Sequence, residues 1–171
     1  MNLDIINKIE TGKSVDNKQL QVLHDLAGKS RDIIVEMGSY NGRSTVALAV
    51  GAGGRKVYAI DWWENVRFTD FWNNMIACGV DDVVCPIRSK SEDVILKPDI
   101  GLLFLDGSKQ PLMIQEDLKR ISCVSRGGYI AIHDYGTSRN ITSALEEYIQ
   151  ENKNLIRVSR HRNLIIFKKG G

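Results

Sequence analysis

VEMGSYNGRS, the stretch at residues 35–44, decides the fold of this chain. The apolar residues 33–35 predict a buried strand, the glycines predict a tight turn, and residues 44–52 predict a helix. Gly38 allows the backbone to approach a ligand closely, and Gly42 allows the start of the helix to pack close to the strand. A strand, a glycine turn and a helix in this order indicate the first unit of an α/β fold.

Strand-like and helix-like segments alternate along the rest of the chain. The further predicted strands are residues 56–61, 83–87, 102–105, 128–132, 155–159 and 164–167. Helices are predicted at residues 68–78, at the apolar stripe of Ile114, Leu118 and Ile121, and at that of Ile141, Ala144, Leu145, Tyr148 and Ile149, with at most a short helix at 92–96. Two N-terminal helices are predicted from the stripe of Leu3, Ile6 and Ile9 and from that of Leu20, Leu23, Leu26 and Ala27, the second with Ser14 as its N-cap.

The strands are continuous apolar runs, which is typical of strands that are buried on both faces of a sheet. Their alternation with helices gives right-handed crossovers and a doubly wound, mostly parallel sheet with helices on both faces. Residues 160–163 are too few for a crossover helix, so the last two strands must be antiparallel. The sequence therefore predicts a Rossmann-like α/β fold.

Size and composition suit one globular domain. The chain has 171 residues, of which 43% are apolar and 26% charged, and this argues against disorder. We predict a single domain over residues 1–171, with N-terminal helices at 1–30 and the core at 31–168. The net charge of +2 gives no electrostatic case for binding nucleic acid or a membrane.

The cysteines and the N-terminal residues indicate a cytoplasmic protein. Cys78, Cys85 and Cys123 are odd in number and form no CxxC pair, so we interpret them as reduced thiols. Residues 1–6 lack the basic segment and apolar run of a signal peptide. No apolar stretch approaches the ~20 residues that a membrane span needs.

The turn at residues 36–42 favours one class of cofactor over another. A dinucleotide site would require G-x-G-x-x-G for its pyrophosphate, whereas this chain has E-x-G-x-x-x-G. The Glu36 carboxylate would repel a phosphate but can hold an ammonium group, so S-adenosylmethionine (SAM), with its amino-acid end and sulfonium, suits it better. Asp61, at the end of the next strand, can accept hydrogen bonds from ribose hydroxyls. Taken singly, the glycines fit a structural turn and Asp61 fits a helix N-cap.

Residues 36–44 resemble the first motif of the catechol-type O-methyltransferases, E-L-G-x-Y-x-G-x-S, with Glu, Gly, Tyr, Gly and Ser in register. The resemblance implies the class I methyltransferase fold, with seven strands of which the last runs against the others. It implies that Gly38 and Tyr40 line the methionine portion of SAM and that Ser44 binds its carboxylate. The same motif adds Ser39 and Gly42 to the implied cofactor site.

The resemblance extends over residues 30–135. It implies that Asp61 fills the ribose position, where the catechol enzymes carry Glu, and that Trp62 covers one face of the adenine. Residues 91–93 match the S-Q-D of those enzymes, which places Ser91 and Glu92 at the adenine edge. The run D-W-W-E at 61–64 is more similar to small bacterial methyltransferases related to cephalosporin hydroxylases.

Two neighbouring strand ends carry candidate catalytic residues. Asp106 follows one predicted strand, and His133 and Asp134 follow the next. In a parallel sheet these ends face the same crevice as Gly38, where two carboxylates and an imidazole can bind a divalent cation such as Mg²⁺. A cation there would hold a substrate oxygen near the methyl group and lower the pKa of that hydroxyl.

The resemblance implies metal ligands at these three positions and a general base at Lys109, which has the D-x-x-K spacing from Asp106. The pair at 133–134 departs from the family pattern, because its first member is usually acidic and is His here. His133 can instead be a hydrogen-bonded histidine at a strand end, or the base of a metal-free reaction. Lys109 can equally be a solvated loop lysine.

Aromatic and basic residues give two weaker signals. An apolar substrate pocket, or a helix face packed on the sheet, would explain the aromatic residues Trp62, Trp63, Phe68, Phe71 and Trp72. The basic C-terminus favours a solvated sheet edge, because charge there blocks strand pairing. Its residues are Lys153, Arg157, Arg160, Arg162, Lys168 and Lys169.

The favoured function is SAM-dependent methyl transfer to a hydroxyl oxygen of a small molecule or sugar. A base methylase is disfavoured because D/N-P-P-Y/F is absent after Leu105. A nicotinamide-dependent oxidoreductase is weakened by the turn at 36–42. The third hypothesis is a non-catalytic, methyltransferase-like binding domain, because the chain is short and has no obvious lid. The same shortness leaves open a homo-oligomer in which a neighbouring subunit closes the pocket.

Overall fold

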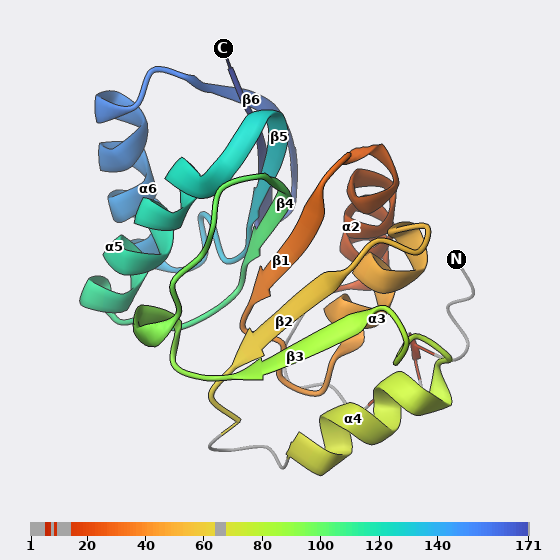
Figure 1. Ribbon diagram of the computed structural model, residues 1–171. Helices are drawn as coiled ribbons and strands as arrows, with labels where there is room; N and C mark the ends of the chain where they lie inside the picture. The colour runs from red at the N-terminus through yellow and green to blue at the C-terminus, as the bar shows by residue number, and fades with distance from the viewer. Residues whose placement is uncertain (1–5, 8, 10–14, 64–67, 171) are drawn as a thin grey trace.

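The computed structural model describes residues 6, 7, 9, 15–63 and 68–170 (Figure 1). The helices are α2 (Asn17–Lys29), α3 (Arg43–Gly51), α4 (Phe68–Ala77), α5 (Pro111–Lys119) and α6 (Arg139–Glu151), with the short 3-10 helices η1 (Ser91–Asp93) and η2 (Arg120–Cys123). The strands are β1 (Ile33–Met37), β2 (Val57–Asp61), β3 (Val84–Arg88), β4 (Ile100–Leu105), β5 (Val124–Ile132), β6 (Leu155–His161) and β7 (Leu164–Lys169). From residue 15 onward each predicted strand and helix is found, although bounds shift by up to four residues and Ile121 lies in η2 rather than in α5.

Seven strands form one sheet in the order β3-β2-β1-β4-β5-β7-β6. The pairs from β3 to β5 are parallel, and β7 runs antiparallel to both β5 and β6. The predicted doubly wound sheet with an antiparallel terminal pair is therefore confirmed. The strand order reverses between β1 and β4, and the carboxyl ends at such a switch point are where α/β folds bind ligands.

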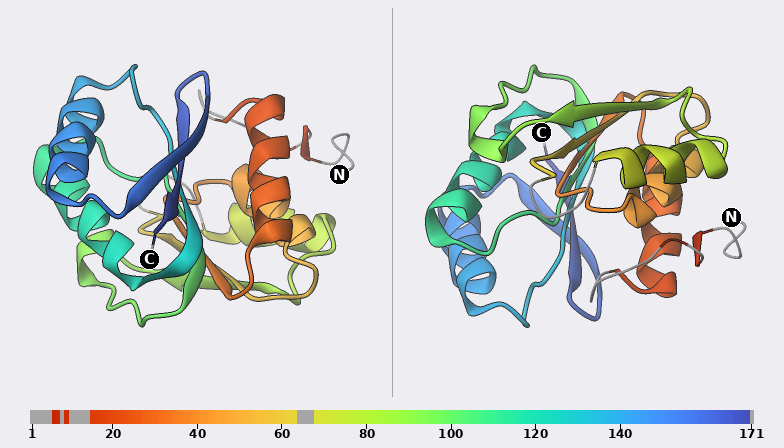
Figure 2. Two further views of the ribbon diagram at one scale, coloured as in Figure 1. Left: turned by 90° about the horizontal axis from the view of Figure 1, so that it is seen from above. Right: turned by 90° about the horizontal axis from the view of Figure 1, so that it is seen from below.

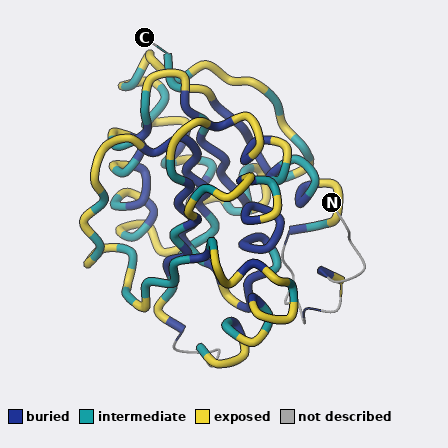
Figure 3. The backbone as a smooth tube through the Cα atoms, turned by 45° about the vertical axis from the view of Figure 1, so that its right-hand side comes forward, coloured by how far each residue is buried: buried dark blue, intermediate teal, exposed yellow. Residues whose placement is uncertain are grey.

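Helices cover both faces of the sheet. α2, α3 and α4 lie on one face, and α5 and α6 lie on the other (Figure 2). Two apolar clusters fill the layers, one containing Leu23, Leu48 and Phe71 and the other containing Ile114 and Leu145. The central strands are buried while the outer faces of the helices are exposed (Figure 3), and all six residues of β4 are buried. The sheet therefore provides a rigid base for loops at its carboxyl edge.

The N-terminus of α2 differs from the prediction. Ser14 and Leu3 lie outside the described residues, and the N-cap is Asp16. The Asp16 carboxylate accepts from the backbone N–H of Gln19 at 2.9 Å, and the Gln19 side chain accepts from the backbone N–H of Asp16 at 3.0 Å. This capping box starts the helix at Asn17, because each side chain satisfies a backbone donor that the first turn leaves free.

Gly42 also acts differently from the prediction. Its φ is +88°, a conformation that favours glycine, and it precedes the first residue of α3. A Cβ built on Gly42 would overlap the methyl group of Met75 and lie 3.0 Å from the ring of Phe71. The close neighbour that requires a glycine is therefore α4, and the predicted packing against the strand is wrong.

The terminal hairpin is longer than the sequence predicted. Arg160 and His161 belong to β6, and His161 pairs with Leu164, so the connection shrinks to Arg162 and Asn163. Strand β5 is also longer than predicted, because it begins at Val124 rather than Gly128, with a shift of register against β4. No helix among the described residues is long and apolar enough to cross a membrane. The division into a single domain over residues 1–171 stays a prediction.

Candidate functional site

The turn after β1 brings two strand ends together. Gly38 has φ +91°, and a Cβ built on it would overlap the carbonyl group of Asp106 at the end of β4. The backbone N–H of Gly38 donates to the carbonyl of Ile60 at 2.9 Å, and that of Asp106 donates to Met37 at 2.9 Å. Glycine is required here because the ends of β1, β2 and β4 converge on one point.

Asp61 ties the end of β2 to this turn. Its Oδ2 accepts from the backbone N–H of Tyr40 at 2.9 Å, and its Oδ1 accepts from that of Trp63 at 2.7 Å. The indole N–H of Trp63 in turn donates to the carbonyl of Tyr40 at 2.8 Å. A carboxylate oxygen can accept more than one hydrogen bond, so Asp61 keeps capacity for a ligand hydroxyl.

A cavity of about 620 Å³ opens above these strand ends. This volume lies within the range of sites for small molecules and cofactors. We call it the carboxyl-edge pocket, and its lining residues are Met37, Gly38, Tyr40, Ile60, Asp61, Trp62, Trp63, Ser89, Lys90, Ser91, Glu92, Asp106, Gly107, Ser108, Gln110 and Met113. The structure thus brings together the predicted site residues Gly38, Tyr40, Asp61, Trp62, Ser91, Glu92 and Asp106.

Other residues of the first motif lie below the lining of the pocket. Glu36 is 0% exposed, and the hydroxyl of Thr45 donates to its Oε2. Burial raises the pKa of Glu36 to about 7. Ser39 and Ser44 are 2% and 7% exposed, and Gly42 faces α4. Glu36, Ser39, Gly42 and Ser44 are not among the residues that line the pocket, so their predicted roles in cofactor binding stay predictions.

Several lining residues were not predicted from the sequence, and Lys90 is the one that carries a charge. Lys90 lies between β3 and η1, and its Nζ is 5.4 Å from the centre of the Trp62 ring. The side chain of Trp62 is 44% exposed, so an aromatic face is open to the pocket beside a positive charge. The only sequence signal for Lys90 is its place next to the S-E-D run at 91–93.

The aromatic segment is mainly structural. Trp63 is 3% exposed and packs against Phe68 and Phe71, with ring centres 5.2 and 4.8 Å apart. Phe68 stacks on Trp72 at 6.4 Å. The interpretation of a helix face packed on the sheet is confirmed for Phe68, Phe71 and Trp72 of α4. Trp62 and Trp63 follow β2 and line the pocket.

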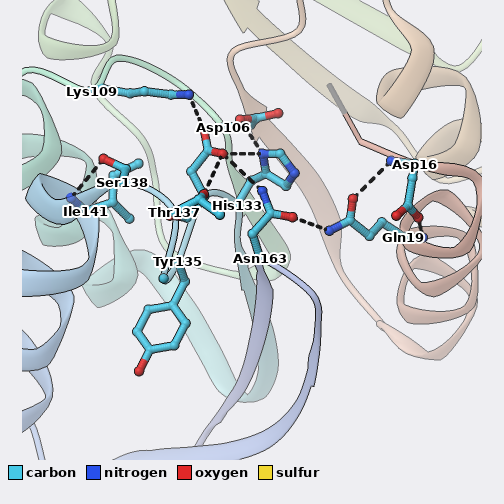
Figure 4. A network of polar contacts seen from close by, with 12 residues as sticks. Asp16, Gln19, Asp106, Lys109, His133, Tyr135, Thr137, Ser138, Ile141 and Asn163 are labelled. Atoms are coloured by element: carbon cyan, nitrogen blue, oxygen red, sulfur yellow. Dashed lines mark hydrogen bonds and ion pairs between the residues drawn. The ribbon is translucent and has the colours of Figure 1, made fainter. Parts of the chain in front are cut away.

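A second group of side chains lies beside the pocket, at the ends of β4 and β5 (Figure 4). The Nδ1 atom of His133 is 3.1 Å from Asp106 Oδ1 and 3.6 Å from Asp134 Oδ1. One ligand-type atom from each of these three residues lies within 4.8 Å of the others. We call this group the Asp–His cluster; it shares Asp106 with the pocket, so the predicted convergence of the three residues is confirmed.

Lys109 reaches the same cluster from the loop after β4. Its Nζ lies 2.5 Å from Asp134 Oδ2, although its side chain is 61% exposed. Asp134 Oδ1 accepts from the hydroxyl of Thr137 at 3.2 Å and from Nδ2 of Asn163 at 3.0 Å. Lys109 is therefore paired with the cluster and is not among the residues that line the pocket.

Electrostatics differ among the members of the Asp–His cluster. Burial raises the pKa of Asp106, although its hydrogen bond with His133 opposes this shift. Burial alone would lower the pKa of His133, but the hydrogen bond and charge of Asp106 outweigh it and raise that pKa. Burial alone would raise the pKa of Asp134, but Lys109 and His133 hold it below its usual value.

The donor set fits a divalent cation. Two carboxylates and an imidazole are ligands that Mg²⁺, Mn²⁺ and related ions accept, and here they converge beside a cavity that Asp106 lines. His133 Nε2 is buried and has no hydrogen-bond partner in the described part of the chain, while Nδ1 faces both carboxylates. A cation held by Asp106, His133 and Asp134 would take the place that the Lys109 ammonium fills beside Asp134.

The sheet order, the antiparallel last pair, the glycine turn after β1 and the acidic end of β2 together define a class I methyltransferase fold. Residues 35–135, more than half of the chain, match the family model described as a methyltransferase domain. The chain therefore belongs to this methyltransferase family.

Solved structures share the fold at low sequence identity. The O-methyltransferase NovP is 16% identical with a TM-score of 0.78, over 90% of this chain and 80% of its own. TomG of Streptomyces achromogenes, an O-methyltransferase of tomaymycin synthesis solved with SAM, is 14% identical with a TM-score of 0.73, over 98% and 90%. An rRNA methylase from Streptococcus thermophilus is 19% identical with a TM-score of 0.69, over 92% and 100%. No curated protein matches the sequence significantly.

Proposed function

We propose that this SAM-dependent methyltransferase transfers the methyl group to a hydroxyl oxygen of a small molecule or sugar, with assistance from a divalent cation. The observation that carries the proposal is Asp106, which lines the carboxyl-edge pocket and also belongs to the Asp–His cluster. A methyl donor in the pocket and an acceptor oxygen at the cluster would thus meet at one residue. Such proximity is a main source of rate acceleration in group transfer.

The pocket residues account for cofactor binding. All four residues assigned to the nucleoside line the pocket. In this proposal Asp61 accepts hydrogen bonds from the ribose hydroxyls, Trp62 covers one face of the adenine, and Ser91 and Glu92 contact its edge. Gly38 and Tyr40 leave room for the methionine portion beside the turn. Glu36 acts from below the turn, where its carboxylate accepts from the Thr45 hydroxyl and ties the end of β1 to the start of α3.

The Asp–His cluster accounts for acceptor activation. A bound divalent cation supplies a Lewis acid that lowers the pKa of the acceptor hydroxyl. Asp106, His133 and Asp134 would hold that cation, which would displace the Lys109 ammonium from Asp134. Lys109 would then accept the hydroxyl proton as the neutral amine, or stabilise the oxyanion as the ammonium. In a reaction without metal, His133 is the group in place to accept the proton, since imidazole titrates near neutral pH.

Two observations favour a small acceptor over nucleic acid. The loop after β4 reads Asp106-Gly107-Ser108-Lys109 and has no Pro-Pro pair of the kind that base methylases carry there. The net charge is only +2, so no broad positive field would hold a polyanion.

Cys78, Cys85 and Cys123 are all free thiols, which supports a location in the cytoplasm.

The experiment is a transfer assay with SAM labelled in its methyl group. Catechols, other phenols and free sugars are offered in parallel with ribosomal RNA, each with and without EDTA. A separate NADH titration tests the oxidoreductase hypothesis. The proposal expects label in a hydroxylated small molecule and its loss on chelation. Label in RNA alone would replace it with an RNA methylase. Tight SAM binding with transfer to no acceptor would favour the non-catalytic hypothesis.

A further inference from the structure

Gln19, in the first turn of α2, and Asn163, in the β6–β7 turn, extend the polar network behind the Asp–His cluster (Figure 4). Gln19 is only 2% exposed. Its Nε2 donates to Asn163 Oδ1 at 2.8 Å and to the carbonyl of His161 at 3.0 Å. Its Oε1 accepts from the backbone N–H of Asp16 at 3.0 Å. A buried amide with every polar atom partnered thus joins the start of α2 to the terminal hairpin.

These partners fix the direction in which each amide group faces. The backbone N–H of Asp16 can only donate, so Gln19 must turn its oxygen toward Asp16 and its nitrogen toward Asn163. The carbonyl of His161 can only accept and requires the same orientation. Asn163 must then offer its oxygen to Gln19, which leaves its Nδ2 to donate to Asp134 Oδ1 at 3.0 Å.

Asp134 is consequently held from several directions. Asn163 and Thr137 donate to its Oδ1, and Lys109 pairs with its Oδ2. Its backbone has φ +60°, a left-handed conformation that Asp tolerates better than most residues. The backbone N–H of the next residue, Tyr135, donates to the carbonyl of Asn163 at 3.0 Å. Asn163 therefore holds both the Asp134 carboxylate and the backbone next to Asp134.

We propose that Gln19 and Asn163 are positioning residues that fix the Asp134 carboxylate in its orientation toward Asp106 and His133. The role of Asp134 in methyl transfer rests on the proposed function. The orientation of its carboxylate does not, because the hydrogen bonds of the network fix it. Outer partners of this kind set the geometry of metal ligands, and their loss typically costs about 10–100-fold in metal affinity. The N-terminus of α2 and the terminal hairpin are thereby parts of the site.

The first test is side-chain NMR of the full chain without added metal. Gln19→Glu keeps an oxygen for the N–H of Asp16, so the capping box survives, but it removes the Nε2 donor that orients Asn163. We expect the Nδ2 proton resonances of Asn163 to move and to exchange faster with water, as they do when Asp134→Ala removes their acceptor. Gln19→Met, which also lacks the donor, gives the same result if a carboxylate is not tolerated in this buried place. Unchanged Asn163 resonances in a folded Gln19 variant would overturn the proposal.

The second test is Mn²⁺ titration followed by electron paramagnetic resonance. Asn163→Ala is expected to weaken Mn²⁺ binding by about 10–100-fold. Asn154→Ala, at an exposed position near the other end of the hairpin, is the matched control and is expected to leave binding unchanged. Equal Mn²⁺ affinity in Asn163→Ala and the unmutated protein would overturn the positioning role. If the unmutated protein binds no Mn²⁺, the metal in the proposed function is wrong, and the Asn163 resonances still decide this inference.

Discussion

The carboxyl-edge pocket and the Asp–His cluster share Asp106, but they are built in different ways. The pocket is shaped by backbone: Gly38 stands against the carbonyl group of Asp106, and Asp61 accepts from the N–H groups of Tyr40 and Trp63. The cluster is held by side chains that bond to one another, from Lys109 through Asp134 to Asn163. A pocket made of backbone tolerates most side-chain changes, whereas a cluster made of side chains depends on each member.

Gly38→Ala should give the largest effect and would test whether backbone shape governs the pocket. At φ +91° a side chain costs about 1–3 kcal/mol of strain, and overlap with the Asp106 backbone adds about 1–3 kcal/mol. We expect S-adenosylhomocysteine binding to be lost in calorimetry and the free energy of unfolding to fall by several kcal/mol.

The matched control is Gly53→Ala. Gly53 also has a positive φ, of +60°, but a Cβ there meets no atom within 4 Å. Its cost is therefore the strain alone, and cofactor binding should be unchanged. A folded Gly38→Ala protein that binds S-adenosylhomocysteine as tightly as Gly53→Ala would show that the pocket does not depend on this close approach.

Asp134→Ala should separate the two regions. Asp134 belongs to the cluster but does not line the pocket, so Mn²⁺ affinity should fall by more than the ~100-fold upper range for an outer partner. S-adenosylhomocysteine affinity should stay within about twofold, since no lining residue changes. Mn²⁺ titration and calorimetry on the same preparation measure both quantities.

Asp82→Ala, an exposed carboxylate after α4, serves as the control for the loss of one negative charge. If Asp134→Ala weakens both ligands equally, the pocket and the cluster form one unit and the contrast between them fails. Chelation of the unmutated protein should reproduce the Asp134→Ala result for any acceptor that is found.

The same contrast explains what the sequence could and could not predict. Gly38 and Asp61 were predictable because their roles follow from local order, a turn after one strand and a carboxylate at the end of the next. The Asp–His cluster was predictable from parallel strand ends meeting at one edge. Gln19 and Asn163 are 144 residues apart and were not predicted, since a buried amide pair leaves no periodicity in the sequence. Packing decides such contacts, as it also decided that Gly42 faces α4.

Glu36 provides a pH test of the layer beneath the pocket. Its pKa is raised by burial to about 7, whereas an unfolded glutamate titrates near 4.5. Between these values the native state binds more protons than the unfolded state, so the free energy of unfolding falls as pH rises from about 4.5 to 7 and is level above 7. From pH 5 to pH 8 this group should contribute a loss of roughly 2–3 kcal/mol.

Glu36→Gln removes that titration and should flatten this part of the stability profile. Urea unfolding of both proteins at pH 5 and pH 8 measures the difference. Asp117, whose pKa burial raises to about 6, titrates in both proteins and cancels in the comparison. Parallel stability profiles for the two proteins would mean that the Glu36 carboxyl titrates near its ordinary value in the folded protein.

Asp61→Asn should give the smallest effect. It separates the role of Asp61 in holding the turn from its role in binding the ribose of the cofactor. The amide keeps one oxygen for a backbone N–H, so the turn largely persists, but the charge that strengthens hydrogen bonds to ribose is lost. Hydrogen bonds to a charged group contribute about 1.5–3 kcal/mol, so affinity for S-adenosylhomocysteine should fall about tenfold. Adenine alone, which lacks the ribose, should bind the variant and the unmutated protein equally. An unchanged dissociation constant for S-adenosylhomocysteine in folded Asp61→Asn would mean that Asp61 only ties Tyr40 to Trp63. The pocket would then owe its ligand contacts, as well as its shape, to backbone.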